Sequence, residues 1–100
     1  MTAQRAGRDV MLRSDVAMMS VTVLYFAGLR EAIGLSEECL PLPPSVRTVG
    51  ELSAHLAERY RAYEANRACV RVARNEQFAS DDEELANGDV IALIPPVAGG

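Results

Sequence analysis

The last two residues, Gly99 and Gly100, follow a Pro-Pro pair and carry the group best placed for chemistry, the C-terminal carboxylate. Pro95 and Pro96 have no backbone N–H, so they cannot continue a β-ladder and they direct the chain away from the body. The six residues 95–100 reach roughly 20 Å at about 3.3 Å per residue, and glycines without Cβ can enter a narrow channel. We therefore predict an extended functional tail that presents Gly100 to another protein's active site; the alternative is a frayed end without a role.

Other catalytic or metal-binding patterns are missing from the sequence. Cys39 and Cys69 lie far apart without a CxxC motif, which is not a zinc spacing, and we expect both to remain thiols. His55 falls on the surface of a helical pattern. Residues 81–84 read DDEE, but consecutive carboxylates lack the alternating spacing of calcium loops, so we interpret them as a solvated acidic loop. We expect no metal, no bound cofactor and no independent catalysis.

Size and charge restrict the function further. One hundred residues make one domain with a thin core, so function belongs on a surface or at a terminus. The net charge of −4 argues against nucleic acid and anionic membranes as partners and favours a protein with a basic docking face. No apolar run is long enough for a signal peptide or a membrane span, which favours the cytoplasm. All ten cations are arginine, so no side chain can accept an isopeptide bond.

The periodicity divides the chain into three parts. Residues 1–19 show little periodicity and are predicted to be a disordered extension, residues 20–94 to be the folded domain, and residues 95–100 to be the tail. Residues 21–26 are β-branched and aromatic and predict a central strand. Gly28 and Gly34 bracket about one helical turn, and a second strand over residues 37–43 belongs at a sheet edge because it contains prolines.

Residues 48–67 form the clearest helical pattern. Thr48 and Glu51 have the spacing of a capping box, and apolar side chains follow at intervals of three and four. An alternating strand over residues 70–75, a short strand around Phe78 and an apolar strand over residues 90–94 come next. We predict an α+β fold of the β-grasp kind, a mixed five-stranded sheet with one main helix across it. The first and last strands would be its parallel central pair, so the tail leaves from the middle of the sheet.

Two stretches, VTVLYFAGLREAIG near the start and NGDVIALIPPVAGG at the end, resemble the small, sulfur-carrying subunit of molybdopterin synthase. That family belongs to the ubiquitin-like β-grasp sulfur carriers, and the resemblance covers about residues 20–100. The chain departs from the family pattern in two features, the extension over residues 1–19 and the absence of lysine, and neither affects the tail.

The resemblance implies a mechanism for Gly100. An ATP-dependent adenylyltransferase, the activating enzyme, would convert its carboxylate into an acyl-adenylate, and a sulfur donor would replace AMP to form a thiocarboxylate. The tail, with Gly99 before the reacting residue, would then insert into the large subunit and pass sulfur to cyclic pyranopterin monophosphate. The carrier would be a non-catalytic subunit, with catalytic residues in the large subunit.

The surface around the tail is the candidate docking site. Phe26, Leu29 and Ile94 either form an apolar patch for a partner or belong to the core. The resemblance also implies a partner contact for Arg30; the alternative is an ordinary solvated arginine on the surface. The predicted partner-binding residues are therefore Phe26, Arg30, Ile94, Pro95, Pro96 and Val97.

Three other functions remain open from the sequence. The chain could carry sulfur for another pathway, such as formation of the thiamine thiazole. It could be a ubiquitin-like modifier whose Gly100 becomes linked to lysines of other proteins. It could also be a binding module without covalent chemistry, in which case removal of the two glycines would leave its activity intact.

Overall fold

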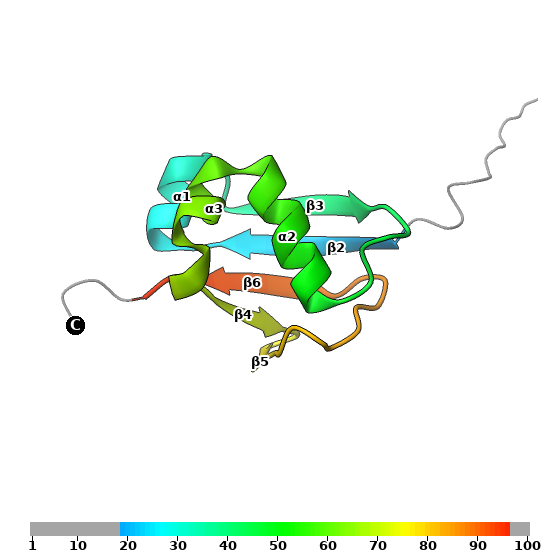
Figure 1. Cartoon of the computed structure of the whole chain (residues 1–100). Helices are drawn as coiled ribbons and strands as arrows, with labels where there is room; N and C mark the ends of the chain where they lie inside the picture. The colour runs from blue at the N-terminus through cyan, green and yellow to red at the C-terminus, as the bar shows by residue number, and fades with distance from the viewer. Residues whose placement is uncertain (1–18, 97–100) are drawn as a thin grey trace, which may run out of the picture.

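The computed structural model describes residues 19–96 of the chain (Figure 1). Strands and helices alternate in the first half, and three strands complete the second half. The elements in chain order are β2 (Met19–Tyr25), α1 (Ala27–Ile33), β3 (Glu37–Leu42), α2 (Val49–Arg59), α3 (Arg61–Asn66), the 3₁₀ turn η2 (Arg67–Cys69), β4 (Arg71–Arg74), β5 (Gln77–Phe78) and β6 (Val90–Ile94).

The five strands form one mixed sheet in the order β3-β2-β6-β4-β5. β2 and β6 are parallel, with Val23 opposite Ile91 and Tyr25 opposite Leu93. The other three neighbouring pairs are antiparallel. The predicted α+β β-grasp fold is confirmed, and so is the parallel pairing of the first and last strands through the helical connection.

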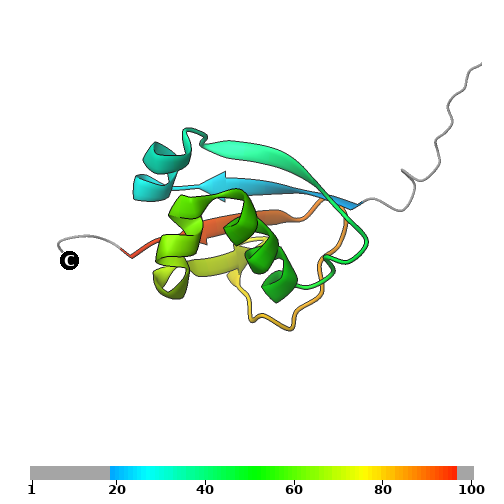
Figure 2. The ribbon, with the colours of Figure 1, turned by 45° about the horizontal axis from the view of Figure 1, so that its top comes forward.

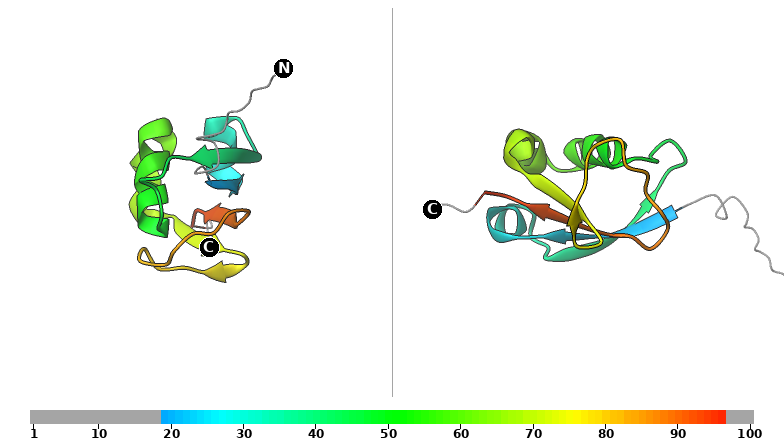
Figure 3. Two further views of the ribbon diagram at one scale, coloured as in Figure 1. Left: turned by 90° about the vertical axis from the view of Figure 1, so that its right-hand side faces the viewer. Right: turned by 90° about the horizontal axis from the view of Figure 1, so that it is seen from below.

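The hydrophobic core lies between the sheet and the helices α2 and α3, which cover one face only (Figures 1 and 3). Alternate residues of the central strands are buried against this layer, as the period of two requires. In β2 and β6 these residues are Val21, Val23, Tyr25, Ile91 and Leu93. Within residues 19–96, no helix is both long and apolar enough to cross a membrane.

The predicted helix over residues 48–67 is wrong in one respect, because it is interrupted. α2 begins with the expected capping box between Thr48 and Glu51, but Tyr60 adopts an extended backbone with φ −130° and ψ 113°. The Tyr60 hydroxyl donates to Oε1 of Glu38 on β3 at 2.7 Å. Its ring also meets that of Tyr25 edge to face at 5.9 Å between centroids. These tertiary contacts outweigh the helical pattern, and the chain turns before α3.

The short helix α1 occupies the end of the sheet where β2 and β6 finish (Figure 2). β2 begins two residues earlier than expected, at Met19 rather than Val21, and it ends at Tyr25 rather than Phe26. Phe26 is the residue before α1, and Ala27 has a positive φ of 51°. Gly34 ends the helix in the left-handed conformation, with φ 89°, which a residue without Cβ adopts readily. The chain therefore turns sharply beside the end of β6.

The opposite end of the sheet is held by a buried carboxylate, that of Asp89. It accepts hydrogen bonds from Arg74 Nε at 2.6 Å, the Ala86 backbone N–H at 2.8 Å and Asn75 Nδ2 at 2.9 Å. Asn75 in turn accepts a bond from the Val90 N–H at 2.9 Å. This cluster ties the β4–β5 hairpin to the start of β6, the strand that leads to the tail.

Candidate functional site

The root of the tail lies at the end of β6, which runs between β2 and β4 (Figure 1). Pro95 is half-buried and Pro96, the last described residue, is exposed. Val97, Gly99 and Gly100 lie outside the described residues, so the extended form of the tail stays a prediction. The placement of its root in the middle of the sheet follows from the strand order.

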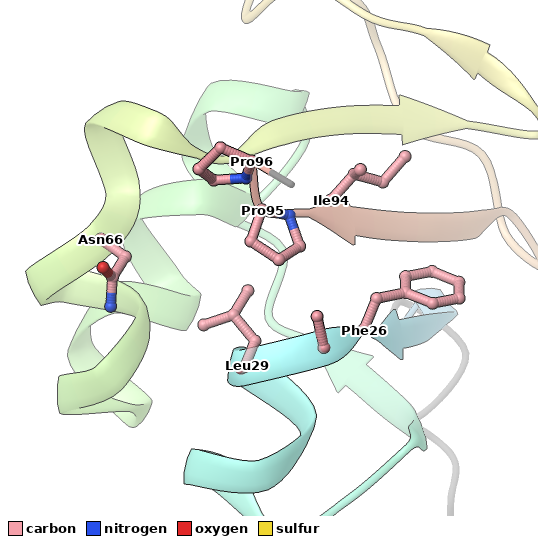
Figure 4. A pocket seen from close by; sticks show the side chains of 8 residues that line it. Phe26, Leu29, Asn66, Ile94, Pro95 and Pro96 are labelled. Carbon is pink, nitrogen blue, oxygen red and sulfur yellow. The ribbon is translucent and has the colours of Figure 1, made fainter. Parts of the chain in front are cut away.

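An apolar groove of about 690 Å³ surrounds this root (Figure 4), and we call it the tail-root groove. It is formed where the end of β6 faces the first turn of α1 and the end of α3. Its lining residues are Phe26, Ala27, Gly28, Leu29, Asn66, Ile94, Pro95 and Pro96. Among the described lining residues, only Asn66 brings a polar side chain, and its Nδ2 donates to the Ala62 carbonyl at 2.8 Å. None of these eight residues has a titratable side chain, and the groove they form suits burial against a partner.

The structure brings together four of the residues predicted to bind a partner. Phe26, Ile94, Pro95 and Pro96 all line the groove, and Phe26 is 43% exposed despite its size. Leu29 contributes to the wall but is only 3% exposed, so the core interpretation of this residue is the correct one.

Two residues are placed differently from the prediction: Arg30 was predicted to contact a partner but lies outside the groove, and Asn66 lines the groove although it was not predicted. Arg30 is exposed on α1 but does not line the groove, so its partner contact stays a prediction. Asn66 lines the groove, although the sequence analysis did not select it. It reaches this position only because the chain turns at Tyr60, and the sequence pattern contains no signal for that turn.

The helices α2 and α3 leave one face of the sheet uncovered (Figure 3). This face carries a second apolar surface, and of its residues only Ile94 was predicted from the sequence to bind a partner. Thr22 lies opposite Val90, Leu24 opposite Ala92 and Ala73 opposite both Ala92 and Phe78, so their side chains share this face. We call it the open face, and its apolar residues are Leu24, Ala73, Phe78, Val90, Ala92 and Ile94. Phe78 is 57% exposed and Val90 38%. Exposed large apolar side chains clustered on one face are typical of an interaction surface.

The perturbed titratable groups of the described residues support the structure rather than chemistry at the tail. Burial first, and then the hydrogen bond to Glu38, raises the pKa of Tyr25 far above its ordinary value. Burial alone would raise the pKa of Glu38, but hydrogen bonds from Tyr60, Tyr25 and Arg59 outweigh it, so the pKa is lowered. This network joins β3 to the end of α2, away from the groove lining.

The described residues 19–96 hold no cluster of three histidine, cysteine, aspartate or glutamate side chains able to bind a metal ion. Cys39 and Cys69 are free and exposed. Of the predicted solvated acidic loop, Asp81, Asp82 and Glu84 are exposed, whereas Glu83 is half-buried and pairs with Arg74 at 3.8 Å.

Taken together, the sheet order and the helices on one face define the ubiquitin-like β-grasp fold class. Comparison with known proteins narrows this class. The model of the ThiS family matches residues 23–100, and the chain belongs to this family. The recognition made from the two terminal stretches of sequence is thereby confirmed.

The curated relatives point to one branch. The chain is 40% identical over 91 residues to the molybdopterin synthase sulfur carrier subunit of Aedes aegypti, covering 83% of this chain and 91% of the relative. It is 33% identical over 86 residues to the protein of the same name from Arabidopsis thaliana, covering 86% of this chain and 88% of the relative.

Solved structures agree on the fold. A putative molybdopterin converting factor subunit 1 from Pyrococcus furiosus is similar, with a TM-score of 0.69 and 34% identity over 79% of this chain and 99% of that one. SAMP1 from Haloferax volcanii has a TM-score of 0.70 and 31% identity, covering 81% and 99%. Subunit 1 in a complex of subunits 1 and 2 of the Helicobacter pylori molybdopterin-converting factor has a TM-score of 0.60 and 29% identity, covering 82% and 100%.

Proposed function

We propose that this chain is the sulfur carrier subunit of a molybdopterin synthase and that the carboxylate of Gly100 carries the sulfur as a thiocarboxylate. The observation that carries the proposal is the agreement between the curated relatives and the position of the tail root. The relatives are sulfur carrier subunits of that enzyme, and the chain leaves the middle of the sheet through Pro95 and Pro96 beside an exposed apolar groove.

The chemistry assigns a simple role to the carrier. An activating enzyme transfers AMP from ATP to the carboxylate, which turns a poor electrophile into a mixed anhydride and releases pyrophosphate. A sulfur nucleophile then displaces AMP to form the thiocarboxylate. The carrier needs no base or metal for these steps, because the partners provide the catalytic groups. The groove accordingly offers apolar contact surface and no titratable side chain.

We propose the large subunit of molybdopterin synthase as the acceptor, in the cytoplasm. The Helicobacter pylori structure contains subunits 1 and 2 of that species' factor together, which supports an equivalent pair here. In this pairing the tail enters the large subunit and the tail-root groove is covered by it. The thiocarboxylate sulfur bonds to cyclic pyranopterin monophosphate, and water hydrolyses the acyl–sulfur bond, which leaves the sulfur on the acceptor and regenerates the carboxylate of Gly100.

Intact mass spectrometry of the full chain tests the carrier role. After incubation with ATP, the activating enzyme and a sulfur donor, we expect a gain equal to the mass difference between sulfur and oxygen, mapped to Gly100. A chain lacking Gly99 and Gly100 should show no gain. A chain lacking residues 2–17 but retaining both glycines is the matched control and should be loaded normally. Repeated failure to load the wild-type chain would contradict the proposal.

One observation supports a second candidate function. SAMP1 belongs to the small archaeal modifier proteins, so a modifier role that links Gly100 to lysines of other proteins deserves a direct test. Denaturing immunoblots of cells expressing a tagged chain should show a single unconjugated band if the chain is only a carrier. A ladder that disappears on deletion of Gly100 would establish conjugation. The chain has no lysine, so such products could not be extended through its own side chains.

A further inference from the structure

The open face carries one cation at the point nearest the tail. Arg71 on β4 lies opposite Ile94, the last residue of β6. Neighbouring strands are about 4.8 Å apart, so Arg71 lies next to the residue from which the tail departs. A partner that receives the tail must approach this end of the sheet, and Arg71 therefore falls within the area that such a partner covers.

The guanidinium of Arg71 is held in one orientation by an aromatic ring. Its Cζ lies 3.8 Å from the centroid of the Phe78 ring, on the neighbouring strand β5. A guanidinium that stacks through its flat face keeps the N–H donors at its edges available. The stack also reduces the side-chain entropy that a partner would have to remove on binding. Arg71 and Phe78 together form a pre-oriented donor of hydrogen bonds on an apolar surface.

The charges around this donor are unusual for so acidic a chain. The net charge of the chain is −4. On the open face, however, the strand register leaves Arg71 as the one charged residue of β2, β4, β5 and β6. The outward-facing acid of the sheet, Glu37, lies opposite Leu24 on the edge strand β3, with β2 and β6 between it and β4. Among the described residues, a partner that approaches this face therefore meets one positive side chain, that of Arg71, with apolar side chains beside it.

We propose that Arg71, positioned by Phe78, binds a carboxylate of the molybdopterin synthase large subunit and so sets how the carrier docks. The proposal rests on the proposed function, because it takes the large subunit as the occupant of the open face. The complementarity is of two kinds: the acidic body favours a basic partner, and the isolated cation requires an acidic side chain opposite it. Paired charges of this sort fix register and exclude wrong partners.

The test measures binding of the full chain to the large subunit encoded in the same genome, by calorimetry at low and moderate salt. Arg71→Met keeps an aliphatic stem over Phe78 and removes the charge, and we expect about tenfold weaker binding with a smaller salt dependence. Arg71→Lys keeps the charge but loses the flat, two-donor geometry, so its affinity should lie between those of Arg71→Met and the wild type. Arg61→Gln, on the exposed start of α3, removes the same charge from the other side of the sheet and should bind like the wild type.

Two further comparisons test the role of the Phe78 ring and ask whether Arg71 binds a carboxylate of the partner or that of its own tail. Phe78→Leu leaves an apolar residue but no ring to hold the guanidinium, so it should weaken binding less than Arg71→Met does. Arg71→Met is also compared in a chain whose Gly100 carboxylate is converted to an amide, because a chain shortened by Gly99 and Gly100 would still end in a carboxylate. An unchanged ratio of affinities supports a carboxylate of the partner, whereas loss of the effect would assign Arg71 to the carboxylate of its own tail and overturn the proposal.

The outcomes distinguish this proposal from the function on which it rests. Normal loading of sulfur together with equal binding of the wild type, Arg71→Met and Arg61→Gln would overturn only the role of Arg71. A defect in loading by the activating enzyme, without loss of affinity for the large subunit, would overturn the choice of partner. Failure of the wild-type chain both to load sulfur and to bind the large subunit would overturn both proposals. Thermal unfolding of each variant confirms that the compared chains are folded.

Discussion

Replacement of Asp89 by asparagine should destabilise the domain by about 2–3 kcal/mol. Asp89 is 5% exposed, and its two oxygens accept three hydrogen bonds. Oδ2 accepts from Arg74 Nε and the Ala86 N–H, and Oδ1 accepts from Asn75 Nδ2. An asparagine amide can keep its oxygen in the Oδ2 position, but its NH₂ group then faces the NH₂ group of Asn75. Rotation of the Asn75 amide would not help, because its oxygen already accepts from the Val90 N–H.

The expected loss of stability in Asp89→Asn follows from this geometry. One hydrogen bond to a charged acceptor is lost, at roughly 1.5–3 kcal/mol, and two are weakened when the acceptor becomes neutral. In a domain of this size, about 2–3 kcal/mol corresponds to a fall in melting temperature of roughly 10–20 °C. Chemical denaturation at pH 7 measures the free energy of unfolding. Asp82→Asn is the matched control: Asp82 is exposed and accepts from Ser80 Oγ, so its loss should stay within about 0.5 kcal/mol.

The pH dependence supplies a second check on Asp89. Burial alone would raise its pKa, but the hydrogen bonds from Arg74, Ala86 and Asn75 outweigh burial and lower it. The carboxylate therefore stabilises the fold above the unfolded pKa of about 3.9, and this contribution is lost as the pH falls through the folded pKa. The stability difference between the wild type and Asp89→Asn should shrink from pH 6 toward pH 3 and below. A difference that is below about 0.5 kcal/mol at pH 7, or that grows on acidification, would refute the reasoning.

Three further substitutions test other parts of the fold by the same denaturation assay. Glu76→Gly should stabilise by about 0.5–1 kcal/mol, because Glu76 has φ 74° in the β4–β5 turn and glycine accepts this angle without steric cost; destabilisation would contradict this. Thr48→Ala should cost about 1 kcal/mol, because it removes the side chain that accepts from the Glu51 N–H at 3.2 Å, whereas Ser45→Ala on the exposed loop should cost little. Leu56→Ala should cost about 2–5 kcal/mol, because Leu56 is fully buried in the core; a cost below about 1 kcal/mol would contradict its place there.

Much of this protein was determined by its sequence alone. The apolar runs at residues 21–26 and 90–94 identified two strands, because β-branched and aromatic residues favour an extended backbone. The capping box at Thr48 located the start of α2 to the residue, because it depends on local hydrogen bonds between residues three apart. The family was also readable, because its terminal motifs are short and contiguous. These features share one property: their causes lie within a few residues of each other.

The tertiary structure decided what local patterns do not specify. The helix over residues 48–67 breaks at Tyr60 because the Tyr60 hydroxyl binds Glu38, 22 residues earlier. That break brings Asn66 into the tail-root groove. A helical periodicity cannot predict either event, because both depend on the distance between α2 and β3.

The docking surface also combines features that the sequence predicts with features that only the tertiary structure decides. Phe26 and Ile94 could be named as candidates from sequence, but whether each was core or surface depended on which sheet face the helices cover. Leu29 proved to be core and Phe26 exposed. Arg71 gains its position from three strands at once, opposite Ile94 of β6 and stacked on Phe78 of β5. The sequence predicted a functional tail over residues 95–100, and only the pairing of distant strands decided which side chains surround its root.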